Sequence, residues 1–530
     1  MGTQGKAARL VGNTNFRMAV VVLLVGVANV LWAERLTINE GLGWDGLIYA
    51  GWVRDFQGVV LTHGVPDYYA GRVLPSAIVH YGMRLFSVPF DSRSIVLAFD
   101  VYNLILLVIS AYVWGLAADK LNIGDRGKWL GFCFLFLNYA NLKQSFYGPV
   151  QTDVSAFALG VLTLYFFLTD SRVGLPLVML LGAFTWPTVA PTAAILYVLP
   201  YRGKSYAGPH TDASTPPPDK AVTLSSAKAA SPPPYKTTTP PYRLNIIIAA
   251  MVSGLTLVML VYLTWSRLAE RVAYYPRALR IDTSLLYLSI AAVPVFLFFG
   301  LRAALADASL FDPRRLFASV SWARVAVVLP VFIIAKIIQN RLWSGESIAW
   351  GGPKSFFIYT LLSSVAEPLI FVVAHVVYFG PCILLLLFFW RRFCEAVGSY
   401  GVGLRIVLIL NLLLAVNPQT RYQVNVLALF VAVLVTILDG AAHGFRGLRG
   451  LLCWALVCLF YSKEWYVFNT APQVDDGTME VLLRFPLQHM FMSIGPWMSK
   501  EMYLVQAGVV ALTATLIYFA VVRRRAVGPA

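Results

Sequence analysis

The chain has 530 residues, of which 58% are hydrophobic and only 13% are charged. A soluble domain carries about a quarter charged residues, and the apolar residues here fall in runs long enough to cross a bilayer. These figures exclude a soluble globular protein. A net charge of +16 would suggest nucleic acid in a soluble chain. Basic residues of membrane proteins gather in cytoplasmic loops, so we expect a multi-pass membrane protein that does not bind nucleic acid.

Motifs of the common soluble enzyme classes do not occur in the sequence. There is no P-loop, no HExxH and no GxSxG elbow, and the five cysteines form no CxxC pair. We therefore expect the cysteines to be small buried hydrophobes rather than a disulfide framework or a zinc site. No cofactor is indicated with certainty, and the need for a divalent cation stays open.

Hydropathy predicts an all-α polytopic membrane protein with about 13–14 membrane segments. The segment 174–200 contains Trp186-Pro187 and Pro191 in its middle. Proline breaks a helix, so this segment predicts two short helices that form a hairpin. The expected spans, in chain order, are about 17–34, 95–117, 129–142, 151–169, 174–200, 244–266, 283–301, 319–340, 367–390, 402–416, 420–438, 450–462 and 502–521.

The positions of the basic residues predict the orientation of the chain. Arg391 and Arg392, and the arginines at 523–525, mark the cytoplasmic side. The loop 201–243 is rich in Pro, Ser, Thr and Lys, which is typical of a disordered linker, and it falls on the same side. It divides the chain into an N-terminal part, 1–200, and a C-terminal membrane half, 244–530. The long first loop, 34–94, then lies outside the membrane.

The stretch "GLGWDGLIYA", residues 41–50, follows the first apolar segment closely and places Asp45 beside Trp44 and Tyr49. A carboxylate beside aromatic rings suits a general base, and the glycines allow a substrate to approach closely. The alternative is that Asp45 caps a short interfacial helix at 46–56, because aspartate is a good N-cap. The local sequence by itself favours the cap, and both roles can hold together.

Two arginines are candidates for binding a phosphate on the outer side. Arg72 precedes an amphipathic stretch in "GRVLPSAIVHYGMRL", and Arg421 and Tyr422 lie at the outer end of a helix in "NPQTRYQ". Arginine can bind a phosphate bidentately. The alternatives are a helix anchor at head-group depth for Arg72, and snorkelling beside an aromatic-belt tyrosine for Arg421.

Three further residues are weaker candidates for substrate contacts. Asp67 shares the first outer loop with Asp45, and Asp153 in "YGPVQTDVSAF" lies at the outer start of a helix, where a cap is the alternative. His375 lies in an apolar helix, where an ionisable group is a functional hypothesis but also fits a packed core histidine. A later stretch, 485–501, carries His489.

Taken together, these motifs resemble the GT-C superfamily of polytopic membrane glycosyltransferases, most clearly over residues 15–200. "WDGLIYA" is similar to the first-loop acid motif of the superfamily, and "GRVLPSAIVHYGMRL" is similar to the "R…LxP" stretch of bacterial cell-surface glycopolymer enzymes. "TRYQ" is similar to a late Arg-Tyr at the outer end of a helix. The chain lacks the double acid of some protein mannosyltransferases, and Trp186 replaces the usual arginine of the broken-helix region.

The resemblance implies a GT-C-like fold in a bacterial-type plasma membrane, with the active site on the extracytoplasmic side. It implies inverting transfer of a sugar from a polyprenyl-phosphate donor to a glycan or lipid acceptor, with residues 1–200 as the catalytic core. Asp45 is the implied general base, and Arg421 with Arg72 binds the donor phosphate. The lipid tail reaches the site between helices. The residues expected to contact substrate are Trp44, Tyr49, Asp67, Tyr422, Asp153 and His375.

Two rival functions remain from the sequence. A transporter or flippase for lipid-linked glycans predicts a central polar path and related halves, but no clear repeat is evident. An O-antigen-type polymerase or ligase would depend on Arg421, Arg484 and His489 rather than on Asp45.

Overall fold

The computed structural model describes residues 13–201, 242–266, 284–307, 310–348, 352–441, 447–468 and 498–523. Regular structure in these ranges is helical, and the described residues contain one isolated bridge, between Val65 and Trp343, in place of a sheet. Within the described ranges, six helices are long and apolar enough to cross a membrane. The chain is therefore an all-α integral membrane protein, while the expected total of 13–14 segments stays a prediction.

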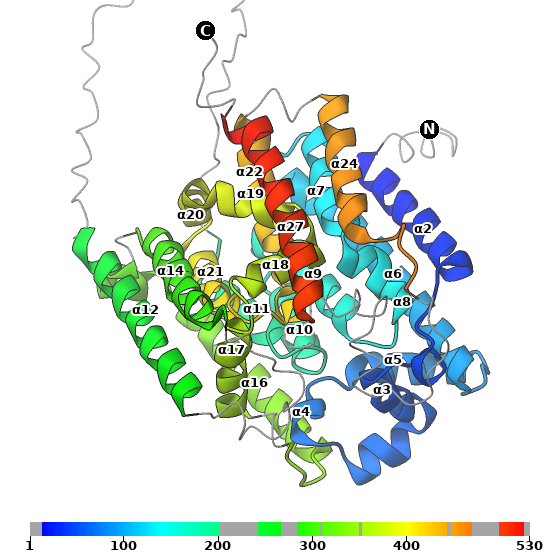
Figure 1. Ribbon diagram of the computed structural model, residues 1–530. Coiled ribbons are helices and arrows are strands. Elements are labelled where there is room, and N and C mark those ends of the chain that lie inside the picture. Colours follow the sequence, from blue (N-terminus) through cyan, green and yellow to red (C-terminus); the bar gives the residue numbers. More distant parts are fainter. Residues whose placement is uncertain are drawn as a thin grey trace, which may run out of the picture.

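The long helices lie close to the ranges that hydropathy predicts (Figure 1). The first two of these helices, Thr14–Trp32 and Ser92–Lys120, pack closely at Gly26, because an added Cβ there would collide with the side chain of Leu104. The six helices are α2 (Thr14–Trp32), α6 (Ser92–Lys120), α12 (Tyr242–Trp265), α14 (Leu286–Ala304), α16 (Trp322–Leu342) and α27 (Lys500–Ile517).

Shorter apolar helices fill the middle of the molecule. The expected break in 174–200 is confirmed, because α10 (Gly174–Ala183) and α11 (Val189–Val198) flank Trp186-Pro187. The expected single span at 367–390 is instead α18 (Ile370–Phe379) and α19 (Cys382–Phe388), since Pro381 has no backbone N–H to donate and Gly380 has a φ of 81°. The other central elements are α7 (Asp125–Phe136), η3 (Tyr139–Gln144), α9 (Asp153–Leu168), α21 (Val402–Leu414), η5 (Thr420–Gln423), α22 (Leu427–Ala441) and α24 (Leu448–Ser462).

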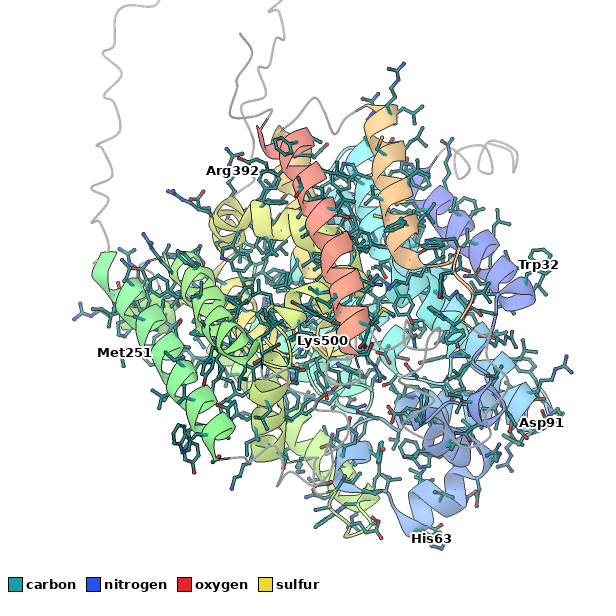
Figure 2. All side chains as sticks on the ribbon, in the orientation of Figure 1. Trp32, His63, Asp91, Met251, Arg392 and Lys500 are labelled. Carbon is teal, nitrogen blue, oxygen red and sulfur yellow. The ribbon has the colours of Figure 1, made fainter. Side chains whose placement is uncertain are left out.

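The first outer loop forms a small helical unit at one end of the molecule. Figure 2 places its residue His63 at the end opposite Arg392. The unit contains η1 (Ile38–Gly41), α3 (Asp45–Arg54), η2 (Phe56–His63), α4 (Asp67–Ala70) and α5 (Leu74–Leu85), and it has its own buried core around Tyr49, Trp52 and Tyr69. The short helix expected at 46–56 is present as α3.

This unit is hydrogen-bonded to two membrane helices. The N–H of Val65 donates to the carbonyl of Leu342 at the end of α16 over 2.7 Å, and the N–H of Leu74 donates to the carbonyl of Phe184 over 2.9 Å. The side chain of Gln339 on α16 donates to the carbonyl of Ala183, at the end of α10, over 2.8 Å. These bonds fix the segment around Arg72 against the break between α10 and α11.

The main buried core contains side chains from both expected halves, such as Phe157 of α9 and Leu429 of α22. The remaining described helices are α8 (Ser145–Tyr147), α15 (Pro313–Ser319), α17 (Pro353–Ser364), α20 (Trp390–Ser399) and η7 (Tyr518–Arg523). Residues 202–241 of the expected linker, together with Arg484 and His489, lie outside the described residues.

Candidate functional site

Three charged side chains from distant parts of the chain meet beside the first outer loop. Arg421 of η5 donates from Nε and Nη2 to the two carboxylate oxygens of Asp153, each over 2.7 Å. Its third nitrogen, Nη1, lies 3.7 Å from Oδ2 of Asp45. The Asp153 and Arg421 side chains are nearly buried, whereas that of Asp45 is 40% exposed. Asp45 is therefore the carboxylate that a small molecule can reach.

Helix capping does not account for either carboxylate. Helix α3 begins at Asp45 itself and α9 begins at Asp153, so the N-cap positions are Trp44 and Thr152, neither of which makes a side-chain capping bond. Both acids lie in the first turn of their helices, where the helix dipole stabilises negative charge. For Asp153 the capping alternative is wrong, because its two oxygens are committed to Arg421.

Arg72 is the second arginine of this region and is only 2% exposed. Its guanidinium carbon lies 4.3 Å from the centre of the Tyr68 ring and 4.8 Å from that of Trp186. The same Trp186 ring lies 5.9 Å from the guanidinium carbon of Arg421. Trp186 therefore lies beside both arginines and belongs to the site.

Tyrosines lie near Arg72, and one of them, Tyr49, interacts with both Arg72 and Asp45. Both Asp45 and Arg72 act electrostatically on Tyr49, and burial raises the pKa of Tyr49 to about 12. The rings of Tyr49 and Tyr69 meet edge to face with their centres 6.4 Å apart. Tyr422 lies beside Trp186, with the centres of the two rings 6.3 Å apart. With its raised pKa, the phenol of Tyr49 stays protonated at neutral pH and can act as a hydrogen-bond donor.

His375 is buried with both ring nitrogens engaged, and its expected contact with substrate stays a prediction. Its Nδ1 lies 2.9 Å from Oγ1 of Thr420, and its Nε2 lies 2.8 Å from the carbonyl oxygen of Ala415. Both ring nitrogens are therefore engaged with the turn that carries Arg421. The alternative interpretation, a packed core histidine, is the one that the geometry supports.

Asp67 and Trp44 lie nearer the edge of the cluster. Asp67 is exposed, and its Oδ1 accepts hydrogen bonds from the N–H groups of Tyr68, over 2.7 Å, and Ile348, over 3.4 Å. It joins the loop after α16 to the first outer loop. Trp44 is half-buried and packs against the main core. The structure thus brings together Asp45, Asp153, Arg421, Arg72, Tyr49 and Tyr422, while Asp67 serves the scaffold.

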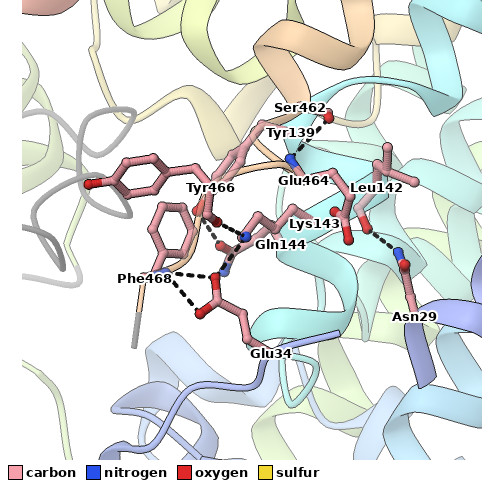
Figure 3. A network of polar contacts seen from close by, with 10 residues as sticks. All are labelled: Asn29, Glu34, Tyr139, Leu142, Lys143, Gln144, Ser462, Glu464, Tyr466 and Phe468. Carbon is pink, nitrogen blue, oxygen red and sulfur yellow. Dashed lines mark hydrogen bonds and ion pairs between the residues drawn. The ribbon is translucent and has the colours of Figure 1, made fainter. Parts of the chain in front are cut away.

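A further polar cluster, which the sequence did not single out, lies where α2 ends (Figure 3). The ammonium of Lys143 lies 2.8 Å from the carboxylate of Glu34 and donates to the carbonyl of Tyr466 over 2.5 Å. The Glu34 carboxylate also accepts from the N–H of Phe468, over 2.7 and 2.8 Å. The cluster ties the start of the first outer loop to the segment after α24.

Among the residues that the structure describes, no group of three or more His, Cys, Asp or Glu side chains could hold a metal ion. The pair of carboxylates at the site is bridged by Arg421 instead. The residues present therefore favour charge balance by arginine, and the need for a divalent cation stays a prediction.

The fold and the site together define an integral membrane protein with a buried acid–arginine cluster at one end. Comparison of the chain with protein families, curated proteins and solved structures finds no match. The likeness of residues 15–200 to the GT-C superfamily accordingly stays a resemblance in short motifs, and the functional argument depends on the site geometry.

Proposed function

We propose that this chain is a membrane glycosyltransferase that moves a sugar from a polyprenyl-phosphate donor to a hydroxyl of a glycan or lipid acceptor. One observation carries the proposal: the accessible carboxylate of Asp45 lies 3.7 Å from the guanidinium of Arg421, and both Asp45 and Arg72 act electrostatically on Tyr49. Such a site offers a base and cationic groups side by side, as transfer from a phosphate leaving group requires.

The chemistry follows from these positions. Asp45 takes the proton of the acceptor hydroxyl while that oxygen attacks the anomeric carbon from the face opposite the phosphate. The bond between the anomeric carbon and the phosphate oxygen breaks, and its electron pair stays on the phosphate. Arginine hydrogen bonds stabilise the charge that develops there. The sugar is transferred with inversion, and no nucleotide sugar enters the step.

An apolar groove supports a lipid-linked donor. It is a narrow groove between the α18–α19 segment and α22, and its lining is apolar except for Gln423. Gln423 belongs to η5, the turn that carries Arg421. From Val426 to Leu434 the groove follows α22 for roughly 12 Å at 1.5 Å per residue, close to the ~15 Å depth of one leaflet. An alkyl chain that widened this groove would present its phosphate near η5.

The location of the site supports an extracytoplasmic reaction. The first outer loop and Arg392 lie at opposite ends of the molecule (Figure 2). Since arginines of short loops gather on the cytoplasmic side, the end with Asp45 faces outward. A bacterial-type plasma membrane is the proposed setting.

The deciding experiment compares three variants in membranes supplied with a panel of labelled polyprenyl-phosphate sugars and acceptors. Asp45→Asn should lower transfer by about 10²–10⁴-fold, the usual contribution of a general base. Glu40→Gln, which changes an exposed carboxylate of the same loop, should leave transfer unchanged. Full transfer by Asp45→Asn would overturn the proposal. Loss of transfer only in His489→Ala would favour the polymerase or ligase alternative.

A further inference from the structure

A left-handed turn lies just before α3, and its backbone is strained. The φ angles are 52° at Asn39 and 57° at Glu40, and the two glycines of the turn, Gly41 and Gly43, have φ angles of 92° and 70°. Left-handed backbone is costly for residues that carry a Cβ, although asparagine tolerates it better than most. Such strain persists only where the surrounding structure fixes it, and it gathers at functional positions.

Two hydrogen bonds close this turn. The side-chain amide of Asn39 donates to the carbonyl of Gly43 over 2.8 Å. The N–H of Gly43 donates to the carbonyl of Ile38, a buried residue, over 3.0 Å. The turn therefore constrains the backbone of Glu40, whereas the side chain of Glu40 is exposed.

The chain on both sides of the turn is docked on one short segment, 147–150. Before the turn, the N–H of Leu36 donates to the carbonyl of Tyr147 over 2.7 Å. After the turn, Gly46 packs so closely that an added Cβ would lie 3.1 Å from the Cβ of Val150 and 3.2 Å from its carbonyl oxygen. The turn therefore brings the chain back to the segment that it left.

This docking accounts for the place of Asp45, the residue that immediately precedes Gly46. The segment that receives Gly46 ends at Val150, three positions before Asp153. Asp153 in turn holds Arg421, whose Nη1 faces Asp45 at 3.7 Å. The close approach that glycine permits is thus made at Gly46 by another part of the same chain.

We propose that the turn at 39–43 and the contact at Gly46 position the carboxylate of Asp45 against Arg421, with Asn39 and Gly46 as positioning residues. This inference rests on the proposed function, in which Asp45 is the base, and adds the part of the fold that aims it. A general base acts only within hydrogen-bond reach of the proton that it takes. A misplacement of about 1 Å can lower a rate by about 10²-fold.

Transfer kinetics of the full-length protein give the first test. Gly46→Ala should lower kcat by about 10- to 100-fold and leave KM nearly unchanged, because the added methyl displaces the base and touches no substrate. Gly51→Ala is the matched control, because Gly51 lies in the same helix and its Cβ would meet no atom within 4 Å. Asn39→Ala should also lower kcat, and Asn39→Gly should lower it less, since glycine adopts left-handed backbone readily.

A thiol at position 45 gives a second test that needs no turnover. The protein carries Asp45→Cys together with Cys453→Ser, because Cys453 is exposed and the other four cysteines are buried. A thiolate is stabilised beside an arginine and at the start of a helix. The midpoint pH of alkylation by iodoacetamide should therefore lie below the usual value of about 8.5. Adding Gly46→Ala or Asn39→Ala should raise this midpoint, and adding Gly51→Ala should not.

The outcomes separate this inference from the proposed function. A lower kcat together with a raised midpoint in Gly46→Ala and Asn39→Ala supports it, and the Asn39 variants decide if Gly46→Ala does not fold. An unchanged midpoint in both overturns it, even where kcat falls, because position 45 has then not moved. Equal effects of Gly51→Ala also overturn it. If Asp45→Asn keeps full transfer, the glycosyltransferase is removed, and a midpoint raised by Gly46→Ala still supports the positioning of residue 45.

Discussion

Arg421 and Asp153 are 268 positions apart in the chain, yet two hydrogen bonds of 2.7 Å join them in a buried pair. The pair links η5, late in the chain, to the start of α9 in the N-terminal part. It therefore holds the two regions of the site in one arrangement and leaves the third nitrogen of Arg421 directed at Asp45.

Because of this pair, we expect substitutions of Asp153 and Arg421 to have strongly coupled effects on the free energy of unfolding. Asp153→Asn should lower the free energy of unfolding by about 3 kcal/mol, because it leaves the Arg421 charge buried without its partner. Arg421→Met should cost a similar amount, and the double variant should cost clearly less than the sum. Thermal unfolding in detergent of all four proteins measures this cycle. Additive effects of the two substitutions would contradict the prediction.

Gly160 on α9 controls how closely the segment with Arg421 packs. An added Cβ would collide with the backbone carbonyl oxygen of Asn425, just beyond η5. Gly160→Ala should therefore displace η5, lower stability by about 1–3 kcal/mol and reduce transfer. Gly254→Ala on α12 is the control, because its Cβ would meet no atom within 4 Å. Equal behaviour of the two variants in melting and transfer assays would refute this role.

His375 supports the same turn through Thr420 and Ala415. His375→Ala should destabilise the protein by about 1–3 kcal/mol, since it leaves buried partners unpaired, and should lower the rate of transfer. His375→Gln can keep one of the two bonds and should recover part of both losses. His63→Ala, at an exposed histidine, serves as the comparison. A stable, fully active His375→Ala protein would show that the turn holds without it.

Lys463, which lies in the sequence between Ser462 and Glu464 of the polar cluster, predicts a dependence of stability on pH. Burial, and then repulsion from Lys143, lowers the pKa of Lys463 well below its usual range, while its ammonium lies 5.3 Å from the centre of the Tyr139 ring. The unfolded chain therefore binds more protons between the folded and unfolded pKa values, and stability rises with pH in that window.

Lys463→Met removes this cost. At neutral pH the variant should be more stable than the parent chain by about 1 kcal/mol in the free energy of unfolding and should therefore unfold at a higher temperature. This difference in free energy should shrink as the pH approaches 10. Melting curves at pH 7 and pH 9.5 measure it. A difference that stays constant or grows with pH would mean that Lys463 does not titrate in this way.

Local patterns in the sequence were sufficient for the membrane character and for most helix positions. Long apolar runs must be helical where no water can satisfy the backbone, so α2, α6 and α12 could be placed from hydropathy. The break at Trp186-Pro187 followed from the missing N–H of proline. The short helix after Asp45 was also expected, although Asp45 begins the helix rather than capping it.

Only the tertiary structure decided which of these residues meet. No local pattern indicates that Asp153 pairs with Arg421, that Trp186 contacts two arginines, or that Glu34 binds Lys143. Such contacts depend on how helices from distant parts of the chain pack, and neither hydrophobic periodicity nor composition encodes that packing. The sequence by itself determined a helical membrane protein with candidate acids and arginines on one side. Three-dimensional packing then committed Asp153 to Arg421 and left Asp45 accessible, because a buried carboxylate is costly unless it is paired and Asp153 is the more deeply buried of the two acids.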